Sequence, residues 1–137
     1  MSEEQAQQLM YQMQMLENYF VELSQKEESL IGIIREASSA IQSIKSISDK
    51  PETFALVPIG MGSFVKAKLS SEDKFVLNLG AGAAMEKDRD SAVNFIESKI
   101  KEMEIALSDI VAQKQQVMAN LEHGKQEINR LIQAVQK

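Results

Sequence analysis

Apolar residues recur along the first third of the chain in alternating steps of three and four, the pattern of a coiled-coil helix. The series runs for about six heptads and departs from apolar residues only at Glu27 and Ser48. Pro51 disfavours helical geometry in the residue before it, so we expect this helix to cover residues 1–49. The positions of the series are Ala6, Leu9, Met13, Leu16, Phe20, Leu23, Glu27, Leu30, Ile34, Ala37, Ile41, Ile44 and Ser48.

A second series with the same alternation fills the last third of the chain and predicts a helix over residues 87–137. It departs from apolar residues only at Lys114 and Gly124. Two separate coils between molecules would also fit the pattern. The equal lengths and the segment that reverses the chain between them favour an antiparallel pair within one molecule. The positions are Val93, Ile96, Ile100, Met103, Leu107, Ile110, Lys114, Val117, Leu121, Gly124, Ile128, Leu131 and Val135.

The middle of the chain, residues 52–86, predicts two tandem β-hairpins. Each consists of two runs of strand-forming residues around a Gly-x-Gly turn, in which glycine supplies the positive φ angles of tight turns. The stretch "GAGAAM" (80–85) could also begin a dinucleotide-binding loop, but Met85 replaces the third glycine and no helix follows. We therefore interpret it as a turn. The expected strands cover residues 54–59, 63–69, 74–79 and 83–86.

The predicted fold class is mainly α with a small β part, a long antiparallel coiled-coil hairpin with two tandem β-hairpins at its base. A two-stranded ribbon is marginally stable in water, and the helices already bury each other's apolar stripes. We therefore expect the strands to pair with other chains, which would also cover their exposed edges. The residues expected to make these contacts are Leu56, Val57, Ile59, Val65, Leu69, Phe75, Leu77 and Leu79.

Two registers of the antiparallel pair leave little overhang. One sets Met13 opposite Gly124, and the other sets Phe20 opposite Gly124. We favour the second, because a large ring would lie over a missing side chain. Both registers place Glu27 and Lys114 in neighbouring layers, where an ion pair would disfavour slipped alignments.

Composition and charge exclude several function classes. The chain has no cysteine, so it holds no disulfide or thiol nucleophile, which fits a cytoplasmic location. The first residues lack the pattern of a signal peptide, and no apolar run is long enough to span a bilayer. The single histidine, His123, falls at an outward heptad position without further metal ligands nearby. We expect no enzyme activity and no cofactor or metal.

The net charge of −5 is unevenly distributed. Residues 1–48 hold seven acidic and three basic residues, and the first basic residue is Lys26. Binding to nucleic acid requires clustered Lys and Arg, which the chain lacks. The sequence therefore predicts no nucleic-acid partner.

Apolar residues outside the stripe gather in residues 10–21 of the first helix. Methionine suits an adaptable binding surface because its side chain is flexible and polarisable. Loose packing at a fraying helix end is an alternative, and a membrane-surface helix is a third, weakened by the absence of basic residues. We expect a binding surface at the free end of the coil, made of Met10, Tyr11, Met13, Met15, Leu131, Ile132 and Val135.

The order helix, "LVPIGMGSFVKAKLSSEDKFVLNLGAGAAMEKD", helix resembles the alpha-class subunit of prefoldin in its archaeal form. The resemblance covers essentially the whole chain. Its specific parts are the "VPIG" strand, the two glycine-containing hairpins, and "LGAG" followed by "MEKD". Ala83 and Ala84 depart from the family, which often has larger residues in the last strand.

The resemblance implies a hexamer of two alpha and four beta chains, with no membrane partner, whose hairpins form a double β-barrel. It also implies that the coil tips hold unfolded polypeptides without ATP and pass them to a group II chaperonin. A structural coiled-coil spacer that docks one defined partner is the alternative function. A holdase should suppress the aggregation of unrelated proteins, whereas a tether should recognise one sequence.

Overall fold

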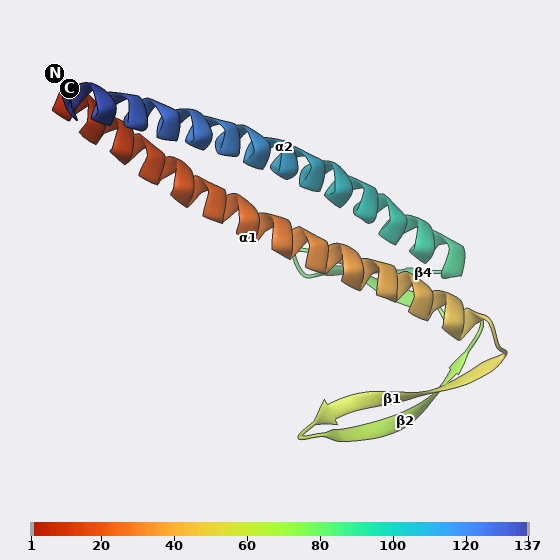
Figure 1. The fold of residues 1–137 in the computed structure, drawn as a ribbon. Coiled ribbons are helices and arrows are strands. Elements are labelled where there is room, and N and C mark those ends of the chain that lie inside the picture. Colours follow the sequence, from red (N-terminus) through yellow and green to blue (C-terminus); the bar gives the residue numbers. More distant parts are fainter. Residues whose placement is uncertain (1, 137) are drawn as a thin grey trace. The chain divides into compact units, whose positions relative to one another are not determined.

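The computed structural model describes residues 2–136, and in it two long helices flank two β-hairpins (Figure 1). The predicted fold class is confirmed, and the helices and strands end close to the predicted residues. The elements in chain order are α1 (Ser2–Ser48), β1 (Glu52–Gly60), β2 (Ser63–Ser70), β3 (Phe75–Gly80), β4 (Ala83–Lys87) and α2 (Arg89–Gln136).

The chain divides into two compact units that each contain parts of both helices. The coil unit comprises Met1–Ile33 and Met103–Lys137, and the hairpin unit comprises Ile34–Glu102. In the coil unit α1 and α2 lie side by side and run antiparallel, so both chain ends lie at the same end of this unit (Figure 1). Its buried apolar side chains belong to the predicted stripes: Met13, Leu23 and Val117.

Met13 lies opposite Gly124, and this contact identifies the register of the coil unit. A Cβ atom built on Gly124 would stand 3.1 Å from both Cγ and Sδ of Met13. The register that we favoured from the sequence, with Phe20 opposite Gly124, is therefore wrong. A flexible thioether side chain fills the space beside the glycine, whereas the Phe20 ring lies 4.9 Å from Nζ of Lys114.

The hairpin unit has a small core between the ends of the two helices. Ile41 and Ile44 of α1 and Ala92 and Val93 of α2 are its buried residues. Two side chains of the second hairpin, Phe75 and Leu77, pack against this cluster together with Ile96 and Ile100.

This contact corrects the expectation that neither hairpin has a covering layer within its own chain. Alternation correctly placed Phe75 and Leu77 on one face of their strand, but that face packs on the helices. We expected both residues to contact other chains, and the structure places both half-buried against the core of the hairpin unit.

Both hairpins are antiparallel, and both turn in the same way. Met61 and Gly62 have φ angles of 51° and 72°, and Ala81 and Gly82 have 52° and 78°. Two consecutive positive φ angles are the requirement of a type I′ turn. A bulge precedes the turn in each hairpin. The prediction that "GAGAAM" forms a turn is confirmed.

Asp88 caps the start of α2. Its Oδ1 accepts a hydrogen bond from the backbone N–H of Ser91 at 2.9 Å, and its carbonyl accepts one from Ala92 at 2.9 Å. Such a side chain satisfies a backbone donor that the first helical turn leaves unpaired. The bond from Ser91 favours the ionised carboxylate and lowers the pKa of Asp88 below its ordinary value.

The first hairpin begins and ends at one place. The backbone N–H of Ser71 donates to the carbonyl of Pro51 at 3.1 Å, just outside the two ends of the hairpin. Asp73 closes the polar link to the second hairpin, because its Oδ2 accepts from the N–H of Ser70 at 2.7 Å. Both bonds hold the strand ends without help from the helices.

Candidate functional site

Large apolar side chains lie exposed on the first turns of α1, as the sequence pattern predicted. Met10 is 59% exposed and Tyr11 is 68% exposed, although the nearby stripe residue Met13 is buried. Tyr11, Met15 and Val21 fall at outward heptad positions. Met10 and Tyr19 fall beside the stripe, and the Tyr19 hydroxyl reaches Gln113 of α2. The exposed members of this set are Met10, Tyr11, Met15, Tyr19 and Val21.

The predicted tip residues are divided by the structure into exposed and buried ones. Ile132 and Val135 of α2 are exposed, and Leu131 is half-buried. Met13, which we had placed on the binding surface, is only 9% exposed because it packs against Gly124. We call the exposed residues at this end of the coil unit the tip surface, and it consists of Met10, Tyr11, Met15, Tyr19, Val21, Ile132 and Val135.

Three further exposed apolar residues on α2 were missed by the sequence reasoning: Ile105, Val111 and Met118. They lie outside the stripe of the second series, at outward or flanking heptad positions. The count of apolar residues outside the stripe that identified Met10 and Tyr11 would have found them if it had been applied to the second helix. The helix α2 therefore also carries exposed apolar side chains away from its last turns.

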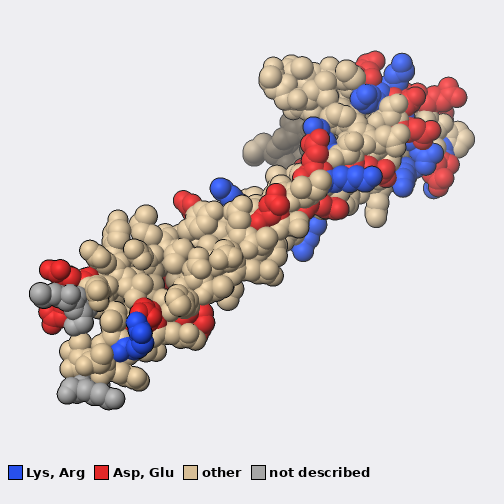
Figure 2. Space-filling model, turned by 90° about the horizontal axis from the view of Figure 1, so that it is seen from above, with Lys and Arg blue, Asp and Glu red and all other residues tan. Residues whose placement is uncertain are grey.

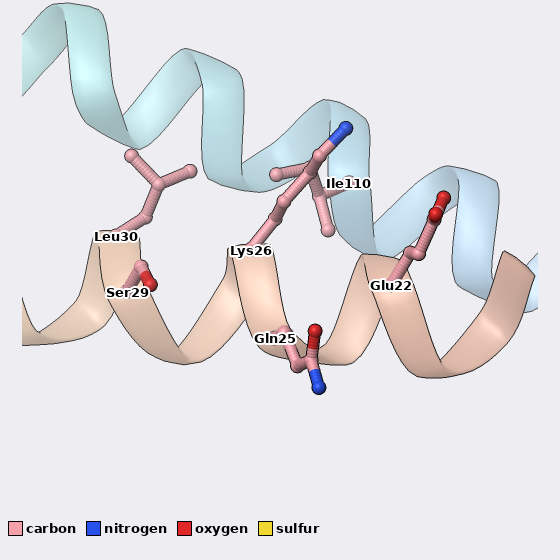
Figure 3. Close-up of a pocket in the computed structure, with 6 residues that line it drawn as sticks. All are labelled: Glu22, Gln25, Lys26, Ser29, Leu30 and Ile110. Atoms are coloured by element: carbon pink, nitrogen blue, oxygen red, sulfur yellow. The ribbon is translucent and has the colours of Figure 1, made fainter.

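An open groove of about 570 Å³ runs between the helices of the coil unit (Figure 3). Leu30 of α1 and Ile110 of α2 line it, and Glu22 and Lys26 extend from α1 toward α2, with Ile110 beside Lys26. Gln25 is on the outer side of α1. The groove has an aliphatic floor with charged groups at its edge, so it can accept an apolar side chain flanked by polar ones.

One ion pair interrupts the apolar stripes of the coil unit. Nζ of Lys114 lies 3.2 Å from Oε1 of Glu27, with both side chains mostly buried, so the predicted pairing is confirmed. The same ammonium group lies near the Phe20 ring. Beside it the Tyr19 hydroxyl donates to Oε1 of Gln113 at 3.0 Å. These contacts join the helices by directional bonds where the stripes lack a continuous apolar core.

Metal chemistry finds no support in the described part of the chain. Within residues 2–136 no group of three or more His, Asp or Glu side chains could hold a metal ion. His123 is exposed, as expected for an outward heptad position. Over the same residues, no helix is both long and apolar enough to cross a bilayer.

The first hairpin carries the largest exposed apolar side chains of the hairpin unit. Phe54 is 72% exposed, and it shares a face with Leu56 and Phe64 according to the strand pairing. Lys66 and Lys68 lie on the same face, and Nζ of Lys68 pairs with Glu52 at 2.9 Å. This face presents aromatic and aliphatic groups between cations, a mixture suited to contact with another protein surface.

Most of the residues expected to contact other chains are exposed. Leu56, Val57, Ile59, Val65 and Leu79 are exposed, and Leu69 is half-buried. Sequence reasoning missed others, although some share a face with residues that it selected, as Phe54 does with Leu56 and Met85 with Leu77. These additional exposed residues are Phe54, Met61, Phe64, Val76 and Met85.

Comparison with known proteins agrees with the fold. Residues 16–137 match the family described as Prefoldin subunit. The prefoldin subunit alpha of Nitrosopumilus maritimus is 56% identical over 137 residues, which span 100% of this chain and 94% of that protein. The prefoldin subunit alpha of Pyrococcus horikoshii is 32% identical over 135 residues, which span 94% of this chain and 86% of that protein.

Among solved structures, a cryo-EM structure of filamentous prefoldin from Methanocaldococcus jannaschii has the same fold. It superposes with a TM-score of 0.72 at 22% identity, covering 83% of this chain and 95% of the other. The family match and the relatives agree with the resemblance read from the sequence. The chain therefore belongs to the prefoldin family of chaperone subunits, within its alpha class.

Proposed function

We propose that the chain is a subunit of an ATP-independent holdase, which binds unfolded or nascent polypeptides at the tip surface. The observation that carries this proposal is the exposure of large apolar side chains from both helices at one end of the coil unit. Exposed apolar residues of this size on a folded protein mark interaction sites when they gather in one region.

The chemistry of the tip surface suits unfolded chains of many sequences. Such chains present apolar side chains that gain about 25 cal/mol for each Å² removed from water. Met10 and Met15 can adapt their shape to different side chains, and Tyr11 and Tyr19 add large, amphipathic rings. Each contact is weak, so a client can leave without nucleotide hydrolysis.

We further propose that the hairpins join this chain to beta-class subunits in a hexamer of two alpha and four beta chains. The exposed apolar strands support this assembly, because a free hairpin with Leu56 and Phe64 in water is unfavourable. Six coils acting on one client would bind far more tightly than one, since the later contacts are intramolecular. The assembled complex would then deliver its client to a group II chaperonin.

The test removes apolar area from the tip surface and leaves the hairpins unchanged. The variant Met10→Ser, Tyr11→Ser, Met15→Ser should assemble with a beta-class prefoldin subunit as the wild type does, measured by light scattering. It should suppress the aggregation of several unrelated unfolded proteins less well. The matched control, Ile105→Ser, Val111→Ser, Met118→Ser, removes similar exposed area elsewhere on the coil unit.

Three outcomes contradict the proposal. Full protection by the tip variant would mean that clients bind elsewhere, and a loss in the control alone would place them on α2. If the wild type protects only one of the unrelated proteins, the chain acts as a tether for a defined partner and not as a general holdase.

A further inference from the structure

The whole net charge of the chain falls in the coil unit. Residues 34–102 contain ten acidic and ten basic residues, so the hairpin unit is neutral. Residues 1–33 and 103–137 contain ten acidic and five basic residues, which accounts for the net charge of −5. On the face shown in Figure 2, blue and red atoms mix around the hairpins, while tan atoms cover most of the coil.

Within the coil unit, the acidic residues concentrate on the helix that carries most of the tip surface. Residues 3–25 of α1 contain the exposed carboxylates of Glu3, Glu4, Glu17 and Glu22 and no Lys or Arg. None of these four carboxylates takes part in an ion pair within residues 2–136.

Helical spacing brings these carboxylates next to the exposed apolar side chains. Glu17 lies four residues before Val21, and Glu22 lies three residues after Tyr19, so each pair is adjacent on the helix surface. Glu4 lies two turns before Tyr11 on the same face. An extended chain that contacts an apolar residue of this surface therefore passes within reach of a carboxylate.

The basic residues that α2 contributes to the coil unit do not cancel the negative charge of α1. Lys125 and Arg130 lie on the last turns of α2 together with Glu122 and Glu127, and Arg130 already pairs with Glu127. Residues 103–137 contain four acidic and four basic residues, so the excess of negative charge in the coil unit belongs to residues 1–33.

We propose that the tip surface selects, among unfolded polypeptides, segments in which apolar side chains are interspersed with lysine and arginine. This proposal rests on the proposed holding function and names its preferred substrate class. Apolar client side chains would bury against Met10, Tyr11 and Met15, while long basic side chains lay their aliphatic stems on the same surface. Their cations would reach the carboxylates or the tyrosine faces. Acidic segments would be repelled.

The test compares three unfolded peptides of identical length and apolar content, whose remaining positions are Lys, Gln or Glu. Binding to the full-length chain is measured by fluorescence anisotropy at low and high salt. At low salt the Lys peptide should bind roughly tenfold more tightly than the Glu peptide, the size expected of two or three exposed ion pairs. Salt should remove most of the difference, because exposed charges are screened.

A variant and a matched control distinguish local charge from net charge. Glu3→Gln, Glu4→Gln, Glu17→Gln, Glu22→Gln should lose the preference while it keeps the affinity for the Gln peptide. The control Glu36→Gln, Asp49→Asn, Glu72→Gln, Glu97→Gln changes the net charge equally with exposed groups of the hairpin unit. It should keep the preference.

The failure of this inference is distinct from the failure of the holding function. If the three peptides bind equally, or if the control loses the preference as fully as the tip variant, the charge selection is overturned while holding stands. If the Gln peptide does not bind at all, the apolar tip surface does not hold unfolded chains, and the proposed function fails with it.

Discussion

Met13 extends across the coil unit toward Gly124, and its Cγ and Sδ atoms lie 3.1 Å from the position that a Cβ atom of Gly124 would occupy. The glycine is therefore part of a packing pair, and its helix is weakened there by about 1 kcal/mol relative to alanine. Gly32 on α1 is a natural comparison, because nothing lies within 4 Å of the position of its Cβ.

This pair predicts different effects for two identical substitutions. Gly32→Ala should raise the free energy of unfolding by about 1 kcal/mol through helix propensity alone. Gly124→Ala should gain less, because Met13 must move aside, and Gly124→Leu should lose about 1–3 kcal/mol through overpacking. Thermal and urea unfolding measure all three. A Gly124→Leu chain as stable as wild type would show that Met13 does not lie opposite this position.

The ion pair between Glu27 and Lys114 should contribute more to alignment than to stability. A double-mutant cycle with Glu27→Ala and Lys114→Ala should give a coupling of about 1 kcal/mol or less. Replacing both residues by leucine should raise the melting temperature, because apolar side chains would replace a partly buried ion pair. It should also allow slipped registers, because no misaligned charge would then lie among apolar side chains.

The absence of native cysteine makes the register directly measurable. A Met13→Cys, Gly124→Cys pair should cross-link readily in the wild-type background, whereas a Phe20→Cys, Gly124→Cys pair should not. In the double-leucine background the second pair should begin to cross-link. Equal cross-linking of the second pair in both backgrounds would remove the alignment role of the ion pair.

The two hairpins should respond differently to a buried or exposed charge. Leu77→Asp places a carboxylate against the core of the hairpin unit and should lower the free energy of unfolding by about 2 kcal/mol or more. Leu56→Asp changes an exposed residue and should alter stability by no more than about 0.5 kcal/mol. It should instead block assembly with a partner subunit. Circular dichroism and light scattering separate the effects, and equal melting temperatures would contradict the packing of Leu77.

Acid should weaken the start of α2 through Asp88. The pKa of this carboxyl is lowered from the ordinary value of 3.8, chiefly by the hydrogen bond from Ser91. Its contribution is therefore complete above pH 3.8 and is lost as the pH falls below that value, through the lowered folded pKa. Asp88→Ala should melt at a lower temperature than wild type at neutral pH, and the difference should shrink in acid.

Asp88→Asn is the matched control for this prediction. Its side-chain oxygen can still accept the bond from Ser91, and it does not titrate. The melting temperature of Asp88→Asn should therefore stay closer to that of wild type at neutral pH than that of Asp88→Ala. If both variants melt alike at every pH, the bond to Ser91 does not stabilise the helix.

The sequence predicted the helices and hairpins because long, unbroken periods and Gly-x-Gly turns are local signals. It did not predict the register, because both alignments keep every apolar residue in the stripe and differ only in how side chains fit. In the structure Met13 packs against Gly124, and the centre of the Phe20 ring lies 4.9 Å from Nζ of Lys114.

The candidate site shows the same limit. The heptad pattern correctly separated exposed Met10 and Tyr11 from the stripe, but Met13 belongs to the stripe and its place on the surface was an error. Alternation likewise identified the shared face of Phe75 and Leu77 and could not say what covers it. Which element covers an apolar face depends on the tertiary fold. The alternation of apolar and polar residues in the strand does not identify that element.

The bond between Ser71 and Pro51 has a consequence for how such chains can diverge. Because the first hairpin leaves and rejoins the chain at neighbouring points, it is topologically an insertion with touching ends. Its removal would shorten the chain while Phe75, Leu77 and the capped start of α2 kept their own contacts. A subunit with two hairpins and one that keeps only the second hairpin can thus differ by one excisable segment.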